Sequence, residues 1–133
     1  MAKREVLPIR DQSDVVRVRH SVRVLAIELG FKVVDQTKIV TAASELGRNT
    51  LVHGRGGDCT LEVLEQDGRR GLKLTFQDNG PGIADIQLAL KDGYTSGDGM
   101  GLGLGGARRL MSEFDIESAP GKGTRVSVIR WNP

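Results

Sequence analysis

Hydrophobic residues recur at three- and four-residue intervals along two stretches of the first half of the chain. In the first stretch, about residues 13–29, one helical face carries Val15, Val18, Val22, Leu25, Ala26 and Leu29. Oxygen-bearing side chains at residues 11–13 can cap the start of this helix, and Gly30 stands where helices commonly end. In the second stretch, Asp35 can cap a helix that runs to about Val52. The pattern therefore predicts two amphipathic helices.

Alternating apolar and polar positions predict five strands, at about residues 4–10, 59–66, 71–77, 114–119 and 124–131. Turn-forming residues join the second strand to the third and the fourth to the fifth, as in β-hairpins. Two further helices are expected at about 84–91 and 104–113. This order predicts an α+β fold, a two-layer sandwich whose mixed, mostly antiparallel sheet has its helices on one face. We see no linker or repeat, so we expect a single domain over residues 1–133.

The composition narrows the function classes without identifying one. Of the 133 residues, 38% are apolar and 27% are charged, and the net charge of +2 does not indicate a nucleic-acid-binding surface. Three Phe, one Tyr and one Trp leave few platforms on which unpaired bases could stack. No apolar run approaches the ~20 residues that span a membrane. With no signal-like start and one cysteine, Cys59, we expect a cytoplasmic protein without a disulfide or a thiolate metal cluster.

Glycine is the most unusual feature of the composition, with 18 residues, and it is concentrated between residues 97 and 106. A flexible linker is one interpretation, but Met and Leu separate these glycines and an amphipathic helix follows directly. The other interpretation is a phosphate site, because backbone N–H groups at a helix start bind phosphate well. The segment has neither the Gly-Lys-Ser/Thr ending of a P-loop nor the Rossmann spacing, so it predicts another kind of nucleotide site.

Two more segments contain groups that could bind part of a nucleotide. Residues 78–83, of sequence DNGPGI, follow a predicted strand and form either a plain turn or a base site. In a base site, Asp78 accepts a hydrogen bond from an adenine amino group, the glycines let the backbone approach the base, and Ile83 covers it. Residues 121–124, of sequence GKGT, are by themselves an ordinary hairpin turn.

The second predicted helix has a polar face in which Glu45, Asn49 and His53 follow at four-residue spacing. This face is either an ordinary solvated surface or the edge of a metal site. In a metal site, the Asn49 amide oxygen binds Mg²⁺, which needs few protein ligands beside phosphates and water. Glu45, one turn away, then serves as a base. The sequence defines no role for His53.

Taken together and in order, these segments resemble the motifs of the GHKL superfamily of ATP-binding proteins. The resemblance implies the Bergerat ATP-binding fold, with ATP and Mg²⁺ as cofactors. It covers residues 35–131, and the matching motifs are the N box at Glu45 and Asn49, the first glycine box at 78–82, the second at 99–104 and the final Gly-x-Gly-Thr element at 121–124.

The same resemblance implies roles for single residues. Glu45 is the catalytic residue, Asn49 is the Mg²⁺ ligand, and Asp78 binds the adenine amino group with support from Thr124 through water. The remaining nucleotide-binding residues that it implies are Gly80, Gly82, Ile83, Gly99, Gly101, Leu102, Gly103 and Leu104, with Gly101 and Gly103 at the phosphates.

Within the superfamily, 133 residues are too few for a transducer domain or a phosphoacceptor helix pair. The chain is most similar to the stand-alone anti-sigma-factor serine/threonine kinases, and among these to RsbT-type switch kinases. Segments that carry this resemblance include 34–36, 44–46, 48–49, 92–94 and 109–111. It implies phosphorylation of a STAS-domain antagonist in a partner-switching stress response, and activation of a PP2C-type phosphatase by binding.

Two alternatives stay open at this point. The chain could be an ATP-gated binding module, or an RsbW-type anti-sigma factor that sequesters a sigma factor. Neither nucleic acid nor a membrane is expected as a partner. The chain is expected to be a monomer or a dimer, and the sequence does not decide between the two.

Overall fold

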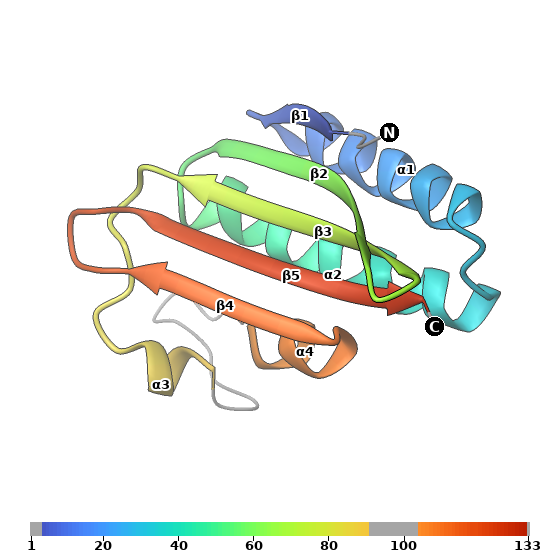
Figure 1. Cartoon of the computed structure of the whole chain (residues 1–133). Coiled ribbons are helices and arrows are strands. Elements are labelled where there is room, and N and C mark those ends of the chain that lie inside the picture. The colour runs from blue at the N-terminus through green and yellow to red at the C-terminus, as the bar shows by residue number, and fades with distance from the viewer. Residues whose placement is uncertain (1–3, 91–103, 133) are drawn as a thin grey trace.

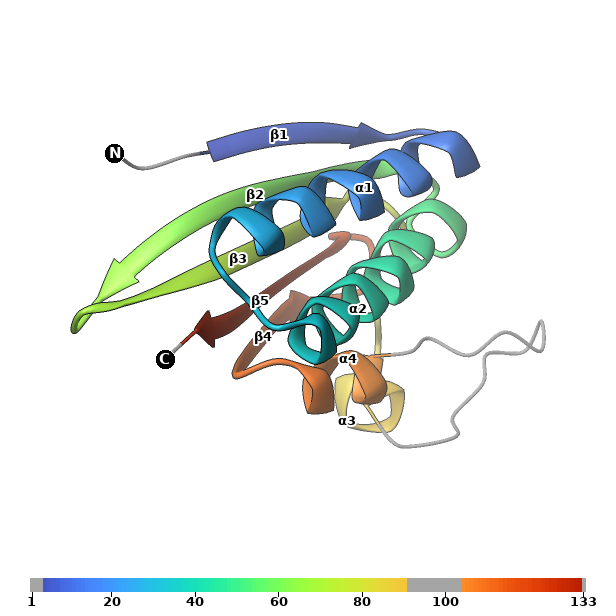
Figure 2. The ribbon, with the colours of Figure 1, turned by 90° about the vertical axis from the view of Figure 1, so that its right-hand side faces the viewer.

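The computed structural model describes residues 4–90 and 104–132 and arranges them in two layers (Figures 1 and 2). One layer is a five-stranded sheet in the order β1-β2-β3-β5-β4. The helices form the other layer, in which α1 and α2 pack against each other. The strands are β1 (Arg4–Ile9), β2 (Gly57–Gln66), β3 (Arg69–Asp78), β4 (Glu113–Ser118) and β5 (Thr124–Asn132). The helices are α1 (Gln12–Glu28), α2 (Val33–Val52), α3 (Ile86–Ala89) and α4 (Leu104–Leu110).

This architecture confirms the predicted two-layer α+β fold. The prediction is wrong in one respect, because every strand pairing in the described residues is antiparallel and none makes the sheet mixed. The reason lies in the connection between β1 and β2. Helix α1 runs away from the end of β1 and α2 runs back, so β2 begins at Gly57, beside Ile9 at the end of β1.

The hydrophobic core lies between the sheet and the two long helices. Alternate strand residues point into it, as the pleat of a strand requires. The largest fully buried side chains include Leu61, Leu72, Leu74 and Phe76 from the strands, and Val18, Val22, Ile39 and Leu46 from the helices. Each such side chain contributes about 1.5–3 kcal/mol relative to an exposed one, so contact between the layers is the main source of stability.

Helix α2 begins before the position predicted from Asp35. Its first residue is Val33 and its N-cap is Lys32, with no side chain capping it, so the prediction of Asp35 as the cap is wrong. Asp35 lies in the first helical turn, where a carboxylate is favourable, and accepts a hydrogen bond from Arg130 Nη2 at 2.8 Å. Arg130 Nη1 donates to the Leu110 carbonyl oxygen at 3.0 Å, so this arginine links α2, β5 and the end of α4.

The shorter helices also differ from their predicted bounds. Helix α3 is confined to one turn inside the predicted range of 84–91. Helix α4 stops before residue 113 because the backbone N–H of Ser112 donates to the Ile129 carbonyl oxygen and pairs the chain with β5. In neither described part of the chain is a helix both long and apolar enough to cross a bilayer.

Trp131, the one tryptophan of the sequence, packs near the end of β5. It is 8% exposed, and the guanidinium carbon of Arg69 lies 4.4 Å from the centroid of its ring. Its Nε1 donates to the Glu113 carboxylate at 2.6 Å. The indole therefore holds β4 to β5, and a cation rests on its face.

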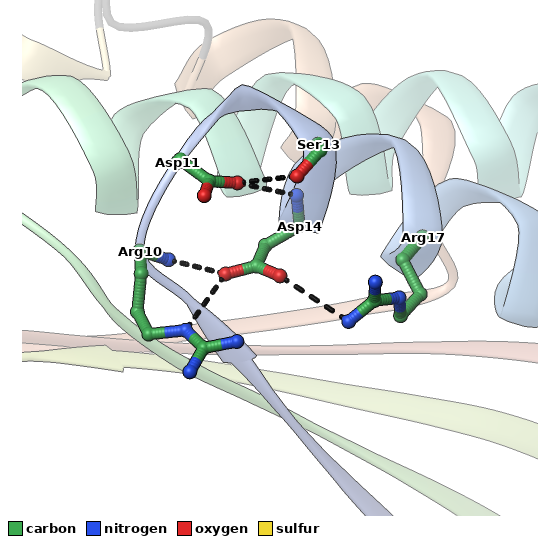
Figure 3. A network of polar contacts seen from close by, with 5 residues as sticks. All are labelled: Arg10, Asp11, Ser13, Asp14 and Arg17. Carbon is green, nitrogen blue, oxygen red and sulfur yellow. Dashed lines mark hydrogen bonds and ion pairs between the residues drawn. The ribbon is translucent and has the colours of Figure 1, made fainter.

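A buried carboxylate, Asp14, organises the start of α1 (Figure 3). Asp11 caps the helix, as predicted, by accepting hydrogen bonds from the Ser13 hydroxyl and the Asp14 N–H. The Asp14 side chain is 3% exposed and accepts from the Arg10 N–H at 2.9 Å, Arg10 Nε at 3.1 Å and Arg17 Nη1 at 3.4 Å. These contacts, and first among them the hydrogen bond from the Arg10 side chain, lower the pKa of Asp14.

We expect Asp14→Asn to destabilise the fold at neutral pH. Because its pKa is lowered on folding, the ionised Asp14 stabilises the folded state above the unfolded pKa of about 3.9. This stabilisation is lost as the pH falls through the folded pKa. Thermal unfolding by circular dichroism should therefore show a lower Tm for the variant at neutral pH and a smaller difference at about pH 3. An equal difference at both pH values would contradict an ionic role.

Candidate functional site

A cavity of about 340 Å³ opens between the two layers, at the end of the sheet where β3 stops and β5 begins. Its lining comes from α2, the segment from β3 to α3, the start of α4 and the inner side of the sheet. Leu46, Phe76 and Val126 belong to its apolar part. Such a cavity, with a few polar groups on apolar walls, is typical of a small-molecule site.

The cavity brings together residues that are far apart in the sequence. Six predicted site residues line it: Asn49, Asp78, Gly82, Ile83, Leu104 and Thr124. Glu45 is one turn before Asn49 on α2, and Gly80 follows β3, but neither belongs to the lining. The predicted residues Gly99, Gly101, Leu102 and Gly103 lie outside the described residues. The roles of all these residues toward a ligand stay predictions.

Asp78 is the buried polar group at this end of the sheet. It is the last residue of β3, it is 9% exposed, and it pairs with Thr124 of β5. Its Oδ1 accepts a hydrogen bond from the Gly80 N–H at 2.9 Å. The turn after β3 thus holds the carboxylate in one orientation on the cavity wall.

Burial raises the pKa of Asp78, and hydrogen bonds from the backbone of Gly80 and Thr124 oppose that shift in part. Removing a carboxylate from water costs free energy that neutral hydrogen-bond donors recover incompletely. Groups whose pKa is shifted by burial are concentrated at ligand-binding and catalytic sites. An acceptor on the wall of an apolar cavity fits an amino group at the edge of a flat ring.

Gly54 leaves the space that the Asp78 side chain occupies. A Cβ added at Gly54 would overlap the Asp78 carboxylate, and one added at Gly80 would lie 2.8 Å from the Gly54 Cα. At Gly82, which has a φ of +77°, a Cβ would overlap the Ala119 carbonyl oxygen. The sequence explained Gly80 and Gly82 by the approach of a base; the structure adds that the protein's own backbone leaves no room for a side chain there.

Ser118, in the last position of β4, connects three segments around the cavity. Its hydroxyl donates to the Gly123 carbonyl oxygen at 2.9 Å and accepts from the Ile83 N–H at 2.8 Å. It also lies 2.9 Å from the Thr124 hydroxyl. Because the Ser118 hydroxyl has one proton, Thr124 is the donor in this contact, which leaves the Thr124 oxygen free to accept.

Comparisons with known proteins decide the family. Residues 34–132 match the model of the histidine kinase-, DNA gyrase B- and HSP90-like ATPases. The chain belongs to this ATPase family. The matched segment contains the whole described lining of the cavity, and the use of ATP follows from the membership.

Relatives within this ATPase family narrow the class further. The serine/threonine-protein kinase RsbT of Bacillus subtilis is 42% identical over 123 residues, which are 92% of each chain. An anti-sigma F factor of a Thermoanaerobacter species is 31% identical over 121 residues, 85% of this chain and 82% of the relative. These similarities confirm the predicted kinship with anti-sigma-factor kinases and the predicted enzyme class, a serine/threonine protein kinase.

Two solved structures share the fold of this ATPase domain. The RsbU and RsbW domains of Rv1364c from Mycobacterium tuberculosis match with a TM-score of 0.64 at 20% identity, over 100% of this chain and 33% of that longer chain. The SiaB–SiaC complex from Pseudomonas aeruginosa contains a match with a TM-score of 0.55 at 17% identity, over 98% of this chain and 89% of the other. At these identities the likeness concerns the fold alone.

In this ATPase domain, the last turn of α2 adds polar groups to the cavity that had no predicted role. Thr50 is buried and donates its hydroxyl to the Leu46 carbonyl oxygen at 3.0 Å. His53, the C-cap of α2, lines the cavity, and its Nε2 is buried with no hydrogen-bond partner among residues 4–90 and 104–132. An unpaired buried nitrogen costs about 1–3 kcal/mol. The spacing of His53 from Asn49 had already placed both side chains on one helical face.

The sequence analysis missed Gly54 and Ser118 as site residues. In the sequence, Gly54 only ends a helix, and Ser118 is one polar position in an alternating strand. Their importance depends on contacts with Asp78 and Ile83, which lie more than 20 residues away in the chain. Knowing that β5 pairs with both β3 and β4 would have brought the segments of Asp78 and Ser118 together.

Proposed function

We propose that this chain uses Mg-ATP to phosphorylate a serine or threonine of a STAS-domain antagonist in a partner-switching stress pathway. The observation that carries the proposal is that Asp78 and Asn49 line the same cavity. The Asp78 carboxylate suits the amino group of an adenine, and the Asn49 amide oxygen suits a metal ion. The similarity to a serine/threonine-protein kinase over 92% of the chain supports the reaction type. As a second output, we propose that the chain activates a PP2C-type phosphatase by binding it.

Asp78 recognises the adenine in this proposal. Its two oxygens have acceptor sites beyond the backbone hydrogen bonds from Gly80 and Thr124, and one of these sites would bind the exocyclic amino group. Thr124, with a free acceptor site on its oxygen, supports the same edge of the base through water. Ile83 covers the base, and its backbone is held in place by the Ser118 hydroxyl.

The residues present fit Mg²⁺. No group of three or more His, Cys, Asp or Glu side chains in residues 4–90 and 104–132 could hold a metal ion by itself. Mg²⁺ is usually bound by one or two protein oxygens together with phosphate and water. Asn49 offers an amide oxygen on the cavity wall. The ion would neutralise phosphate charge during transfer.

Glu45 is the catalytic base of the proposal. It is half-buried and lies one turn before Asn49, about 6 Å along the axis of α2. The substrate oxygen bonds to the γ-phosphorus, the bond from that phosphorus to ADP breaks, and the hydroxyl proton passes to Glu45. A base beside the cavity, outside its lining, suits a substrate hydroxyl that a partner protein brings in from the surface.

Phosphate transfer from γ-labelled Mg-ATP to a purified STAS-domain protein tests the proposal. We expect label on the STAS-domain protein. Glu45→Ala should lower the transfer rate by about 100-fold or more with unchanged ATP affinity, and Asn49→Ala should lower both. Thr41→Ala, at an exposed position of the same helix, is the matched control. It should leave the transfer rate and the ATP affinity unchanged. Tight ATP binding without any label would contradict a kinase.

Sequestration of a sigma factor is a second candidate, favoured by the similarity to anti-sigma F factors. ATP would then set the shape of a binding module. Affinity purification in the presence of ATP distinguishes the two candidates, because a retained sigma factor, without label on the STAS-domain protein, would favour sequestration.

We further propose that the protein acts in the cytoplasm on protein partners, with neither nucleic acid nor a membrane as a ligand. The near balance of 19 basic and 17 acidic residues supports this choice, since a nucleic-acid site needs a concentrated positive surface.

A further inference from the structure

His53 places on the cavity wall a buried nitrogen that the described part of the chain leaves unpaired. Among residues 4–90 and 104–132, its Nε2 is the single buried side-chain nitrogen or oxygen that lacks a hydrogen-bond partner. Buried polar atoms in native proteins are nearly always paired, and each exception needs an explanation. Because this exception lines the cavity, a ligand in the cavity is the partner that the structure suggests.

The backbone around His53 is fixed at the cavity wall. Leu46, Asn49, Thr50 and His53 follow at three- and four-residue spacing, so all four line the cavity from one face of α2. The backbone N–H groups of His53 and Gly54 both donate to the Asn49 carbonyl oxygen at 3.0 Å. The main chain is thus held on both sides of the His53 side chain, which favours a positioned group over a mobile one.

His53 lies at the same end of the cavity as Asp78. The residue after it, Gly54, approaches the Asp78 side chain so closely that an added Cβ would overlap the carboxylate. Three residues further, Gly57 begins β2 and pairs with Asp78 in the sheet. The segment from His53 to Gly57 therefore passes along the carboxylate. Because both side chains line the cavity, a group that Asp78 binds there comes close to the imidazole.

Adenine presents two kinds of group at the edge that Asp78 is proposed to bind. Its amino group donates, and the ring nitrogens N1 and N7, which flank that amino group, accept. An ionised carboxylate can bind only the donor, because it has no proton to give. A hydrogen-bond donor beside Asp78 would therefore complete the recognition of this edge, as the paired acceptor and donor of an asparagine side chain do for adenine in DNA.

The imidazole of His53 can supply this donor. A neutral imidazole has one N–H and one acceptor nitrogen, and its surroundings decide which nitrogen carries the proton. A carboxylate at the same end of the cavity favours the proton on the buried Nε2, because negative charge attracts an N–H group and repels a lone pair. A bound base then offers the Nε2–H the acceptor that the described residues do not provide.

We propose that His53 is a specificity-determining residue of the nucleotide site, whose Nε2–H donates to a ring nitrogen, N1 or N7, beside the adenine amino group. This role rests on the proposed binding of adenine by Asp78 and deepens it. Two side chains from different elements, α2 and β3, then bind neighbouring atoms of one base. A purine without an acceptor at that ring position should be bound less tightly, even when its amino group is intact.

Two ATP analogues test this hydrogen bond on the wild-type protein. In 7-deaza-ATP and 1-deaza-ATP, a CH group that cannot accept replaces one of the two ring nitrogens. Calorimetric titration should show that one of the analogues binds the wild type about 10-fold more weakly than ATP, as expected for one hydrogen bond. His53→Phe keeps a flat ring without the N–H, so it should bind that analogue and ATP equally well. A merely structural role of His53 would instead weaken all three nucleotides in parallel.

His20→Phe is the matched control, because it makes the same change at the other histidine of the sequence, at an exposed position of α1. It should bind all three nucleotides like the wild type. If neither analogue binds the wild type more weakly than ATP, or if His53→Phe keeps the full difference, the role of His53 is refuted while ATP binding through Asp78 stands. A wild type that does not bind ATP at all would refute the proposed function, and the role of His53 with it.

Discussion

Asp78→Asn is expected to abolish tight ATP binding and, at the same time, to raise the Tm of the protein. The carboxylate accepts on two sides, from the Gly80 N–H and from the adenine amino group of the proposed complex. An amide accepts on one side and donates on the other, so in either orientation it opposes a donor with a donor. Losing a hydrogen bond to a charged acceptor costs about 1.5–3 kcal/mol, so we expect affinity to fall about 10- to 150-fold.

The stability change has the opposite sign because the pKa of Asp78 is raised on folding. The folded state then binds the proton more tightly than the unfolded chain, and the ionised group costs stability at pH values above its folded pKa. Asparagine removes this cost while its oxygen can still accept from the Gly80 N–H. The gain in Tm should be present at neutral pH and shrink at about pH 3.

Calorimetric titration with Mg-ATP and thermal unfolding measure the two effects on the same samples. Asp67→Asn is the control, because Asp67 is exposed in the β2–β3 turn at a φ of 53°, which asparagine tolerates well. It should leave ATP affinity unchanged. An Asp78→Asn protein that binds ATP like the wild type would refute the assignment of Asp78 to the base.

Gly54→Ala is expected to lose ATP binding and to lower the Tm. The added methyl group would overlap the Asp78 carboxylate, so either the carboxylate turns away from its bond to Gly80 or the end of α2 moves. Both outcomes disturb the cavity wall. We expect affinity to fall about 10-fold or more, because a displacement of even about 1 Å in a positioning group has effects of this size or larger.

Gly68→Ala separates this effect from the general cost of replacing a glycine. Gly68 lies in the β2–β3 turn at a φ of +77°, and within the described part of the chain no atom beyond its sequence neighbours lies within 4 Å of an added Cβ. The variant should lose about 1–2 kcal/mol of stability from backbone strain and keep its ATP affinity. If Gly54→Ala behaved in the same way, the close contact with Asp78 would not matter for the site.

The fold could be predicted from the sequence because each element has a local pattern. The spacing of Val15, Val18 and Val22 requires a helix whichever surface it packs against, and α1 differs from its predicted range by one residue at each end. The hairpins could likewise be predicted, because turn-forming residues lie between stretches in which apolar and polar positions alternate. Motif order then brought Asn49, Asp78 and Thr124 into one predicted site, and the structure places them around one cavity.

What sequence reasoning missed depends on partners that are distant in the chain. Asp35 has the chemistry of a helix cap, but Arg130, 95 residues later, holds it inside the first turn. The direction of β1 follows from the packing of two antiparallel helices, which periodicity does not encode. Gly54 matters because of Asp78, and no local signal distinguishes a glycine that ends a helix from one that makes room for a carboxylate.

The position of Trp131 determines what intrinsic fluorescence can report. Trp131 is seven positions after Thr124 in β5, so it lies about 23 Å along the strand from the cavity. The indole is shielded by Arg69 and bonded to Glu113 at the far end of the sheet. Its fluorescence emission will change when the protein unfolds or when β4 separates from β5, but it will not change when ATP binds. Nucleotide occupancy must therefore be followed by a label on the nucleotide.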